Sequence, residues 1–146
     1  DAELESANGK PVFVINHQPF KLTHNLPATW GNGTNKEAGS MGDQNDEVRA
    51  ILTEHAADGN VFFITGHLHS GFGPDSYNNV DGIHSINLPS FSVKNATGTY
   101  NDAGTGYILE IYEDEVIFRA RDYAKGVWVA EETGDSSYDL VIPVVK

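Results

Sequence analysis

Two histidines at the end of an apolar segment are the residues best suited to chemistry in this sequence. His67 and His69 follow Val61–Ile64, an unbroken apolar run, with Thr65 and Gly66 between them. Neutral imidazole is a ligand for zinc, manganese, iron and nickel, and a glycine lets the backbone turn sharply or approach a ligand closely. The pattern indicates a metal site, provided that a bend brings both histidines to it. Ordinary hydrogen-bonding loop histidines are the alternative.

A third histidine has a similar position in the sequence. His17 directly follows Lys10–Asn16, a second apolar segment with Pro11 near its start. Apolar runs of this kind predict strands that are buried on both faces. In open α/β sheets, ligands bind beyond the carboxyl ends of such strands. We therefore expect His17, His67 and His69 at one edge of a sheet, as metal ligands.

The segment between the two predicted strands has the pattern of a helix. Over Asp43–Asp58, apolar residues recur at the spacing of one helical face. Asp43 or Asn45 is expected to cap its start, and Gly59 to close its end. Strand, helix and strand in this order form a parallel crossover, which brings the ends of both strands to one edge. His55, on the apolar face, is expected to be a packed side chain and not a ligand.

A long loop rich in Gly, Asn and Thr, Lys21–Gly42, precedes this helix. Loops of this length in compact domains are commonly functional or disordered. Trp30, within the loop, and Phe20, just before it, are candidates for one wall of a substrate cleft. The alternative is that they anchor the loop to the body of the domain. His24 is a further candidate for the cleft.

The C-terminal half has the pattern of an antiparallel sheet. Gly71–Gly82 is expected to be a loop, and a strand is expected within Gly82–Ser92, with His84 as a hydrogen-bonded strand residue. Segments rich in β-branched and aromatic residues then predict a hairpin and further strands at Gly106–Tyr112, Val116–Arg121, Gly126–Ala130 and Tyr138–Val144. Pro143 favours an edge position for the last strand. The predicted fold class is therefore α/β, antiparallel and β-rich toward the C-terminus.

The composition limits the classes of partner. A chain of 146 residues suffices for one domain with its own core, so residues 1–146 are expected to form a single domain. Nine Lys and Arg against 21 Asp and Glu give a net charge of −12, which argues against binding nucleic acid or an anionic membrane surface. The absence of cysteine excludes thiolate ligands and disulfides. The loop composition slightly favours a secreted or cell-surface bacterial protein.

Two short motifs together resemble the C-terminal part of the calcineurin-like metallophosphoesterases. They are Ile15–Pro19 (Ile-Asn-His-Gln-Pro) and Gly66–His69 (Gly-His-Leu-His), in the family's order and about 50 residues apart. Gly104–Tyr112 and the following hairpin are also similar to the family's closing segments. The resemblance covers most of the chain and implies part of a β-sandwich flanked by helices.

The resemblance also implies a two-metal site that hydrolyses phosphomonoesters or phosphodiesters. The family holds two divalent ions (manganese, iron, zinc or magnesium), bridged by an aspartate and a water or hydroxide. By motif, His17 and His67 would bind one metal, and His69 the other. Two cations of this kind lower the pKa of the attacking water and neutralise charge on the phosphoryl oxygens.

Three other motifs of the family have no counterpart at the expected place. Asp-x-His and Gly-Asn-His-Asp/Glu are absent from the 146 residues, and the Gly-Asp-x-x-Asp of Gly42–Asp46 follows His17 where the family has it before. We therefore expect the C-terminal fragment of a metal-dependent phosphoesterase, inactive in isolation because upstream ligands are missing. Apolar surface exposed by truncation would favour self-association.

Two other functions are compatible with the same residues. One is a non-catalytic binding or structural module whose histidines are vestigial. The other is a mononuclear zinc site of His17, His67 and His69 with water as the fourth ligand.

Overall fold

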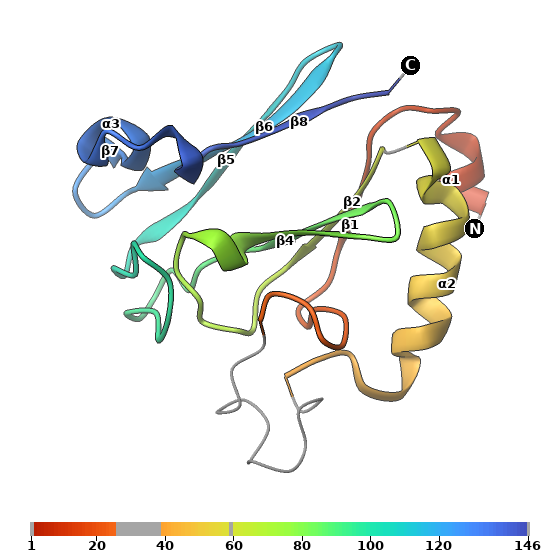
Figure 1. Cartoon of the computed structure of the whole chain (residues 1–146), viewed down its shortest axis with the longest axis horizontal. Helices are drawn as coiled ribbons and strands as arrows, with labels where there is room; N and C mark the ends of the chain where they lie inside the picture. Colours follow the sequence, from red (N-terminus) through yellow and green to blue (C-terminus); the bar gives the residue numbers. More distant parts are fainter. Residues whose placement is uncertain (1, 26–38, 59, 146) are drawn as a thin grey trace. The chain divides into compact units, whose positions relative to one another are not determined.

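The chain divides into two units, and each carries one β-sheet (Figure 1). The computed structural model describes residues 2–25, 39–58 and 60–145. The first unit contains the described residues up to Leu68, together with Tyr77–Asn87 and Val145, and the second contains His69–Ser76 and Leu88–Val144. The mixed α/β class is confirmed, and so is the antiparallel sheet toward the C-terminus. The expectation of a single domain stays a prediction.

The sheet of the first unit is built on parallel strands. β1 (Val12–Ile15) pairs with β2 (Val61–Thr65), and β2 pairs with β4 (Ile83–Asn87), both in parallel. β3 (Tyr77–Val80) pairs antiparallel with β4 at the other edge. Every residue of β2 is buried, as its apolar sequence predicts.

Helix α2 (Asn45–His55) packs against this sheet and connects the two strands that carry the histidines. Its buried Leu52, with Ala56 just beyond it, lies in one core cluster with Val61 and Phe63 of β2. The 3-10 turns η1 (Gly42–Gln44) and η2 (Ala56–Asp58) flank the helix, and α1 (Ala2–Ser6) adds a short helix that the sequence pattern did not predict. The strand–helix–strand crossover is therefore confirmed.

Neither Asp43 nor Asn45, the residues expected to cap α2, occupies its N-cap position. Gln44 occupies the N-cap position without a side-chain capping bond. Asn45 Oδ1 instead accepts a hydrogen bond from the backbone N–H of Lys21 (2.7 Å), and its Nδ2 donates to Asp46 (2.8 Å). The predicted cap is wrong because this asparagine ties the helix start to the preceding loop. Gly59 lies outside the described residues.

β1 differs from its prediction in burial. Its residues are half-buried, and Ile15 at its end is 77% exposed. In the described part of the chain β1 lies at the edge of the sheet, with β2 as its partner on one side. Apolar composition predicts a buried strand, but it cannot distinguish a central strand from an edge strand whose flank is left uncovered.

The segment expected to be a loop, Gly71–Gly82, contains regular structure. η3 (Pro74–Ser76) leads into β3, whose asparagines suggest a turn by sequence. In the structure their carboxamides bond to neighbouring backbone: Asn78 Oδ1 accepts from His24 N–H, and Asn79 Oδ1 accepts from Gly82 N–H (3.1 Å). The prediction is wrong because pairing with β4 overrides the turn preference of asparagine.

The second unit carries an antiparallel sheet centred on β6 (Glu115–Asp122). β5 (Thr105–Ile111) pairs along one edge of β6, and β7 (Val127–Trp128) and β8 (Leu140–Pro143) pair with different parts of its other edge. Burial alternates residue by residue along β6, as expected for a sheet with one covered face. The predicted hairpin and the edge position of Pro143 are confirmed.

Helix α3 (Val129–Thr133) replaces the end of the strand expected at Gly126–Ala130. Gly134, in the left-handed conformation at φ +72°, ends this helix, and η4 (Ser136–Tyr138) leads into β8. Val129, the first residue of this helix, packs with Phe72 and Ala120 in the core of the second unit.

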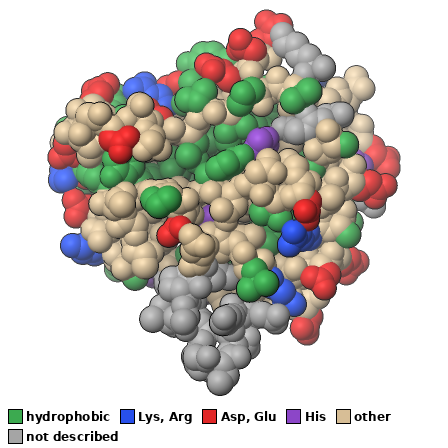
Figure 2. Space-filling model, in the orientation of Figure 1, with side chains coloured by type: hydrophobic (Ala, Val, Ile, Leu, Met, Phe, Trp, Pro, Cys, Tyr) green, Lys and Arg blue, Asp and Glu red, His purple; other side chains and the backbone are tan. Residues whose placement is uncertain are grey.

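The surface combines acidic and apolar groups. Hydrophobic side chains reach the surface on the face drawn in Figure 2, alongside the acidic groups that produce the negative charge. None of the helices in the described ranges has the length and hydropathy that crossing a bilayer requires.

Candidate metal centre

Parallel pairing of β1 and β2 brings two of the predicted ligands together. The register pairs Ile15 with Ile64, so both strands end at the same edge of the sheet. Two further backbone hydrogen bonds extend the pairing, from Asn16 N–H to the Ile64 carbonyl (3.0 Å) and from Gly66 N–H to the His17 carbonyl (3.1 Å). The segments that follow the two strands are thereby held side by side.

The two imidazole rings that follow these strands are in direct contact. His67 Nδ1 lies 3.0 Å from His17 Nε2, and the rings meet edge to face, with centroids 4.9 Å apart and planes at 78°. His17 is exposed and His67 is half-buried. One nitrogen must carry a proton if the contact is a hydrogen bond, whereas both must present lone pairs to bind a cation. The prediction that these residues share an edge is confirmed.

The spacing of these nitrogens also suits two ligands of one metal ion. Nitrogens bound at about 2.0–2.1 Å, with an angle of about 90–110° between the bonds, lie roughly 2.9–3.4 Å apart. The observed 3.0 Å falls within this range. His17 and His67 could therefore hold a cation through Nε2 and Nδ1, with the protons on the opposite ring nitrogens.

The backbone after β2 is strained at both histidines. His67 has φ +66° and His69 has φ +48°, in the left-handed region that residues other than glycine rarely adopt. Each such residue costs about 1–2 kcal/mol, and strain of this kind concentrates at functional sites. Leu68, between them, is fully buried. Gly66 has no positive φ, and a Cβ there would meet nothing within 4 Å, so no turn or close packing in the structure requires the glycine.

His69 belongs to the second unit. Its ring is exposed, and its carbonyl accepts a hydrogen bond from Ala96 N–H (2.7 Å). Across residues 2–25, 39–58 and 60–145, no three or more His, Cys, Asp or Glu side chains form a group that could hold a metal ion. Of the predicted ligands, the structure brings together His17 and His67, and a ligand role for His69 stays a prediction.

The proposed cleft residues lie in different surroundings. His24 is buried at φ +55°, and its Nε2 lies 2.9 Å from Ser85 Oγ. It lines a cavity of about 590 Å³ whose walls include Lys21, Asn78 and neither histidine of the pair. Phe20 is fully buried and stacks on Phe63 at 4.3 Å, so its predicted place in a cleft wall is wrong. Trp30 lies outside the described residues.

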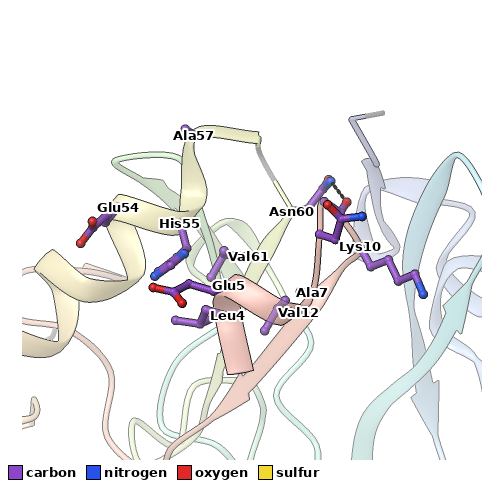
Figure 3. Close-up of a pocket in the computed structure, with 12 residues that line it drawn as sticks. Leu4, Glu5, Ala7, Lys10, Val12, Glu54, His55, Ala57, Asn60 and Val61 are labelled. Atoms are coloured by element: carbon purple, nitrogen blue, oxygen red, sulfur yellow. Dashed lines mark hydrogen bonds between the residues drawn. The ribbon is translucent and has the colours of Figure 1, made fainter. Parts of the chain in front are cut away.

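The remaining histidines of the first unit are packing residues or line a small cavity. His84 Nδ1 lies 2.9 Å from the Tyr77 hydroxyl, and its ring stacks on Phe62, which confirms its prediction as a hydrogen-bonded strand residue. His55 is half-buried and lines a cavity of about 240 Å³ with Leu4 and Glu5 of α1 (Figure 3).

The second unit contains a charged cluster that the sequence analysis missed. Asp122 is fully buried and accepts hydrogen bonds from the Tyr100 hydroxyl (2.8 Å) and from Lys125 N–H (2.8 Å). The Lys125 ammonium lies 2.9 Å from the Tyr100 hydroxyl, 3.0 Å from Asp102 and 3.4 Å from Glu132. These residues form no sequence motif, because the fold gathers them from loops, the end of β6 and helix α3, up to 32 positions apart.

The cluster shifts the ionisation of its members. Burial, and then the hydrogen bond to Glu132, raises the pKa of the Tyr100 hydroxyl. Hydrogen bonds to Tyr100 and Asp102 raise the pKa of the Lys125 ammonium. Burial alone would raise the pKa of Asp122, but the hydrogen bonds from Lys125 N–H and Tyr100, with the charge of Lys125, lower it. The cluster is therefore held with Lys125 charged, Tyr100 neutral and Asp122 ionised.

A comparison with models of known protein families and with curated proteins found no match for this chain.

Proposed function

We propose that this chain supplies the histidine part of a two-metal phosphoesterase centre that hydrolyses phosphomonoesters or phosphodiesters. The observation that carries the proposal is the contact of His17 Nε2 with His67 Nδ1 at the carboxyl ends of two parallel strands. The 3.0 Å between these two nitrogens suits two ligands of one cation. The strained backbone at His67 and His69 is typical of a functional site. The resemblance to calcineurin-like metallophosphoesterases provides the reaction class.

Within this proposal each histidine has one task. His17 and His67 hold one divalent ion, and His69 contributes to the second. When bound, two such cations would lower the pKa of the attacking water and neutralise charge on the phosphoryl oxygens. The carboxylate ligands would come from polypeptide outside these 146 residues, because Asp-x-His and Gly-Asn-His-Asp/Glu do not occur within them. The chain alone is then inactive, and the complete fold would be a β-sandwich flanked by helices.

Among the described residues of the first unit, the end of β1 is left uncovered. A parallel sheet is normally covered on both faces, and β2 meets that expectation whereas β1 does not. Ile15, the residue two before His17, is 77% exposed. Polypeptide packed over this end of β1 would cover the apolar side chain and would lie where further ligands are needed.

Titration of the chain with manganese and with zinc tests the histidine pair. We expect His17→Ala and His67→Ala each to weaken binding of the tighter metal at least about tenfold, since each removes one of few ligands. His84→Gln is the matched control, because this histidine lies in the same sheet and is bonded to Tyr77. Binding that is unchanged in both alanine variants would refute the proposal.

Hydrolysis assays separate the alternatives. The isolated chain should not turn over a chromogenic phosphodiester with either metal, and steady turnover would refute its predicted inactivity. A mononuclear zinc site would show one tight equivalent of zinc that is lost equally on substitution of His17, His67 or His69. A longer polypeptide containing these residues, inactive with every metal although it folds, would favour a non-catalytic module.

A further inference from the structure

The position of His67 is fixed by the backbone around it. Leu68 N–H donates to the Gly66 carbonyl (2.7 Å), which closes a three-residue γ-turn with His67 at its centre. Since φ at His67 is +66°, this is the rarer and strained form of the turn. Thr65 and Leu68 are both buried. The point from which the His67 side chain leaves the backbone is therefore set by the turn and by its buried neighbours.

His17 is placed differently, in an exposed position just beyond the end of β1. The pairing with β2 is irregular here. Because Ile15 pairs with Ile64, a continued parallel ladder would bring the Gly66 N–H to the carbonyl of Asn16. This N–H bonds instead to the carbonyl of His17 (3.1 Å). Regular strand pairing therefore does not set the direction of the His17 ring.

The side chain of Asn16 spans this irregular position. Its Nδ2 donates a hydrogen bond to the Gln18 carbonyl (2.7 Å), so the carboxamide joins the residues on either side of His17. Phe20, two residues further on, is fully buried and stacks on Phe63 with ring centroids 4.3 Å apart. The segment that carries His17 is therefore attached to the sheet before and after this residue, with the Asn16 bond across it.

We propose that Asn16 is a positioning residue of the candidate metal centre. Its bond to the Gln18 carbonyl holds the backbone of His17, and so keeps Nε2 of this ring at the observed 3.0 Å from Nδ1 of His67. Two ligands that are arranged in advance bind a cation more tightly, because less conformational freedom is lost on binding. This inference rests on the proposed role of both histidines as ligands of one metal ion.

Zinc titration of the whole chain, followed by calorimetry, tests this role. Asn16→Leu removes the donor and keeps a side chain of similar size. We expect it to weaken zinc binding about tenfold, at the lower end of the effect of residues that orient metal ligands. Asn79→Leu is the matched control, because the Asn79 carboxamide also bonds to nearby backbone, at Gly82, and β4 lies between its strand and β2. Unchanged zinc affinity in Asn16→Leu would overturn the proposal.

A second variant separates the hydrogen bond from simple packing. Asn16→Ser keeps a hydroxyl donor that can bond to neighbouring backbone, so it should retain more zinc affinity than Asn16→Leu. A role in packing alone predicts the reverse order, because serine fills less of the space than leucine does. The reverse order, or an equal loss in both variants, would overturn the proposal. Circular dichroism confirms that each variant is folded.

Nuclear Overhauser effects between the two rings test the geometry without metal. The ring centroids of His17 and His67 lie 4.9 Å apart, so the metal-free wild-type chain should show cross-peaks between their protons. We expect Asn16→Leu to lose most of this intensity and Asn79→Leu to keep it. Wild-type intensity in Asn16→Leu would overturn the proposal. Loss of the cross-peaks in Asn16→Leu, combined with a wild-type chain that binds no metal, would support the role of Asn16 in holding the pair and would refute the phosphoesterase proposal alone.

Discussion

The two units of this protein use their polar side chains in opposite ways. In the first, His17 and His67 meet at the ends of parallel strands, and the ring of His17 is exposed. In the second, Tyr100, Asp122 and Lys125 bond to one another around a fully buried carboxylate. Both groups stand out as polar clusters. A cluster whose donors and acceptors satisfy one another stabilises the fold. A pair of imidazoles of which one is exposed and the other lies on a strained backbone is suited to bind a ligand.

The backbone shows the same contrast. β5 and β6 keep an unbroken register over their paired length, from Thr105–Asp122 to Ile111–Val116. The segment after β2 instead places His67 and His69 in the left-handed region. A regular ladder minimises strain, whereas left-handed residues other than glycine retain it, and such strain is commonly found where side chains are directed at a ligand.

The largest effect is expected from removal of the buried carboxylate. Asp122→Ala should lower the free energy of unfolding by about 3 kcal/mol, because the Tyr100 hydroxyl, Lys125 N–H and the ammonium lose a buried partner. Asp114→Ala, an exposed aspartate of the β5–β6 turn, should change it by less than about 0.5 kcal/mol. Urea denaturation measures both. Equal effects would remove the structural role assigned to the cluster.

The same cluster predicts a loss of stability in alkali. Tyr100 and Lys125 have pKa values raised above 10.0 and 10.5 in the folded state, so above these values the unfolded chain binds fewer protons than the folded one. Stability then falls as the pH rises. Tyr100→Phe should make this decline shallower without abolishing it, because burial raises the pKa of Tyr107 as well. An identical pH profile of the free energy of unfolding would contradict the assignment.

Backbone strain at His67 predicts a smaller effect, a difference in stability between two substitutions of this residue. At φ +66°, His67→Gly should be more stable than His67→Ala by about 1 kcal/mol, since glycine adopts the left-handed region without penalty. Both variants lose the imidazole, so metal binding should weaken equally. Gly66→Ala is the control, and we expect it to be neutral or slightly stabilising because its Cβ meets nothing within 4 Å. Equal stability of the two His67 variants would show that this backbone stores no strain.

The smallest effect is expected at an exposed ion pair of the first unit. Arg49 Nη2 lies 2.6 Å from Asp81 Oδ2, with both side chains partly exposed. Asp81→Asn removes the charge while retaining a residue that tolerates the φ of +54° at this position. We expect a loss below about 0.5 kcal/mol, abolished in high salt. A loss as large as that of Asp122→Ala would mean that both units depend on charge pairs.

Local sequence patterns account for the elements whose environment is uniform. The apolar run of β2 is buried throughout, the apolar face of α2 packs on it, and alternation along β6 matches its burial. The crossover rule for parallel strands also correctly predicted that His17 and His67 share an edge. These predictions succeed because the spacing of apolar residues is set by the period of the element itself.

Other features depend on neighbours that are distant in sequence. Pairing with β4 makes a strand of asparagine-rich β3, and Val129 at the start of α3 packs on Phe72, which is distant in the sequence. Contacts between residues 61 positions apart bury His24 against Ser85. No local pattern contains these contacts, and for that reason the sequence analysis missed them.

By itself, then, the sequence determined β1 and β2, the strands that precede His17 and His67, and the helix α2 between them, because the pattern of apolar residues is a local property. Tertiary structure alone decided that β1 is an edge strand, that Phe20 belongs to the core, and that Asp122 is surrounded by Tyr100 and Lys125. Burial and pairing are properties of the neighbours that folding brings to a residue, and the residue's own type does not specify those neighbours.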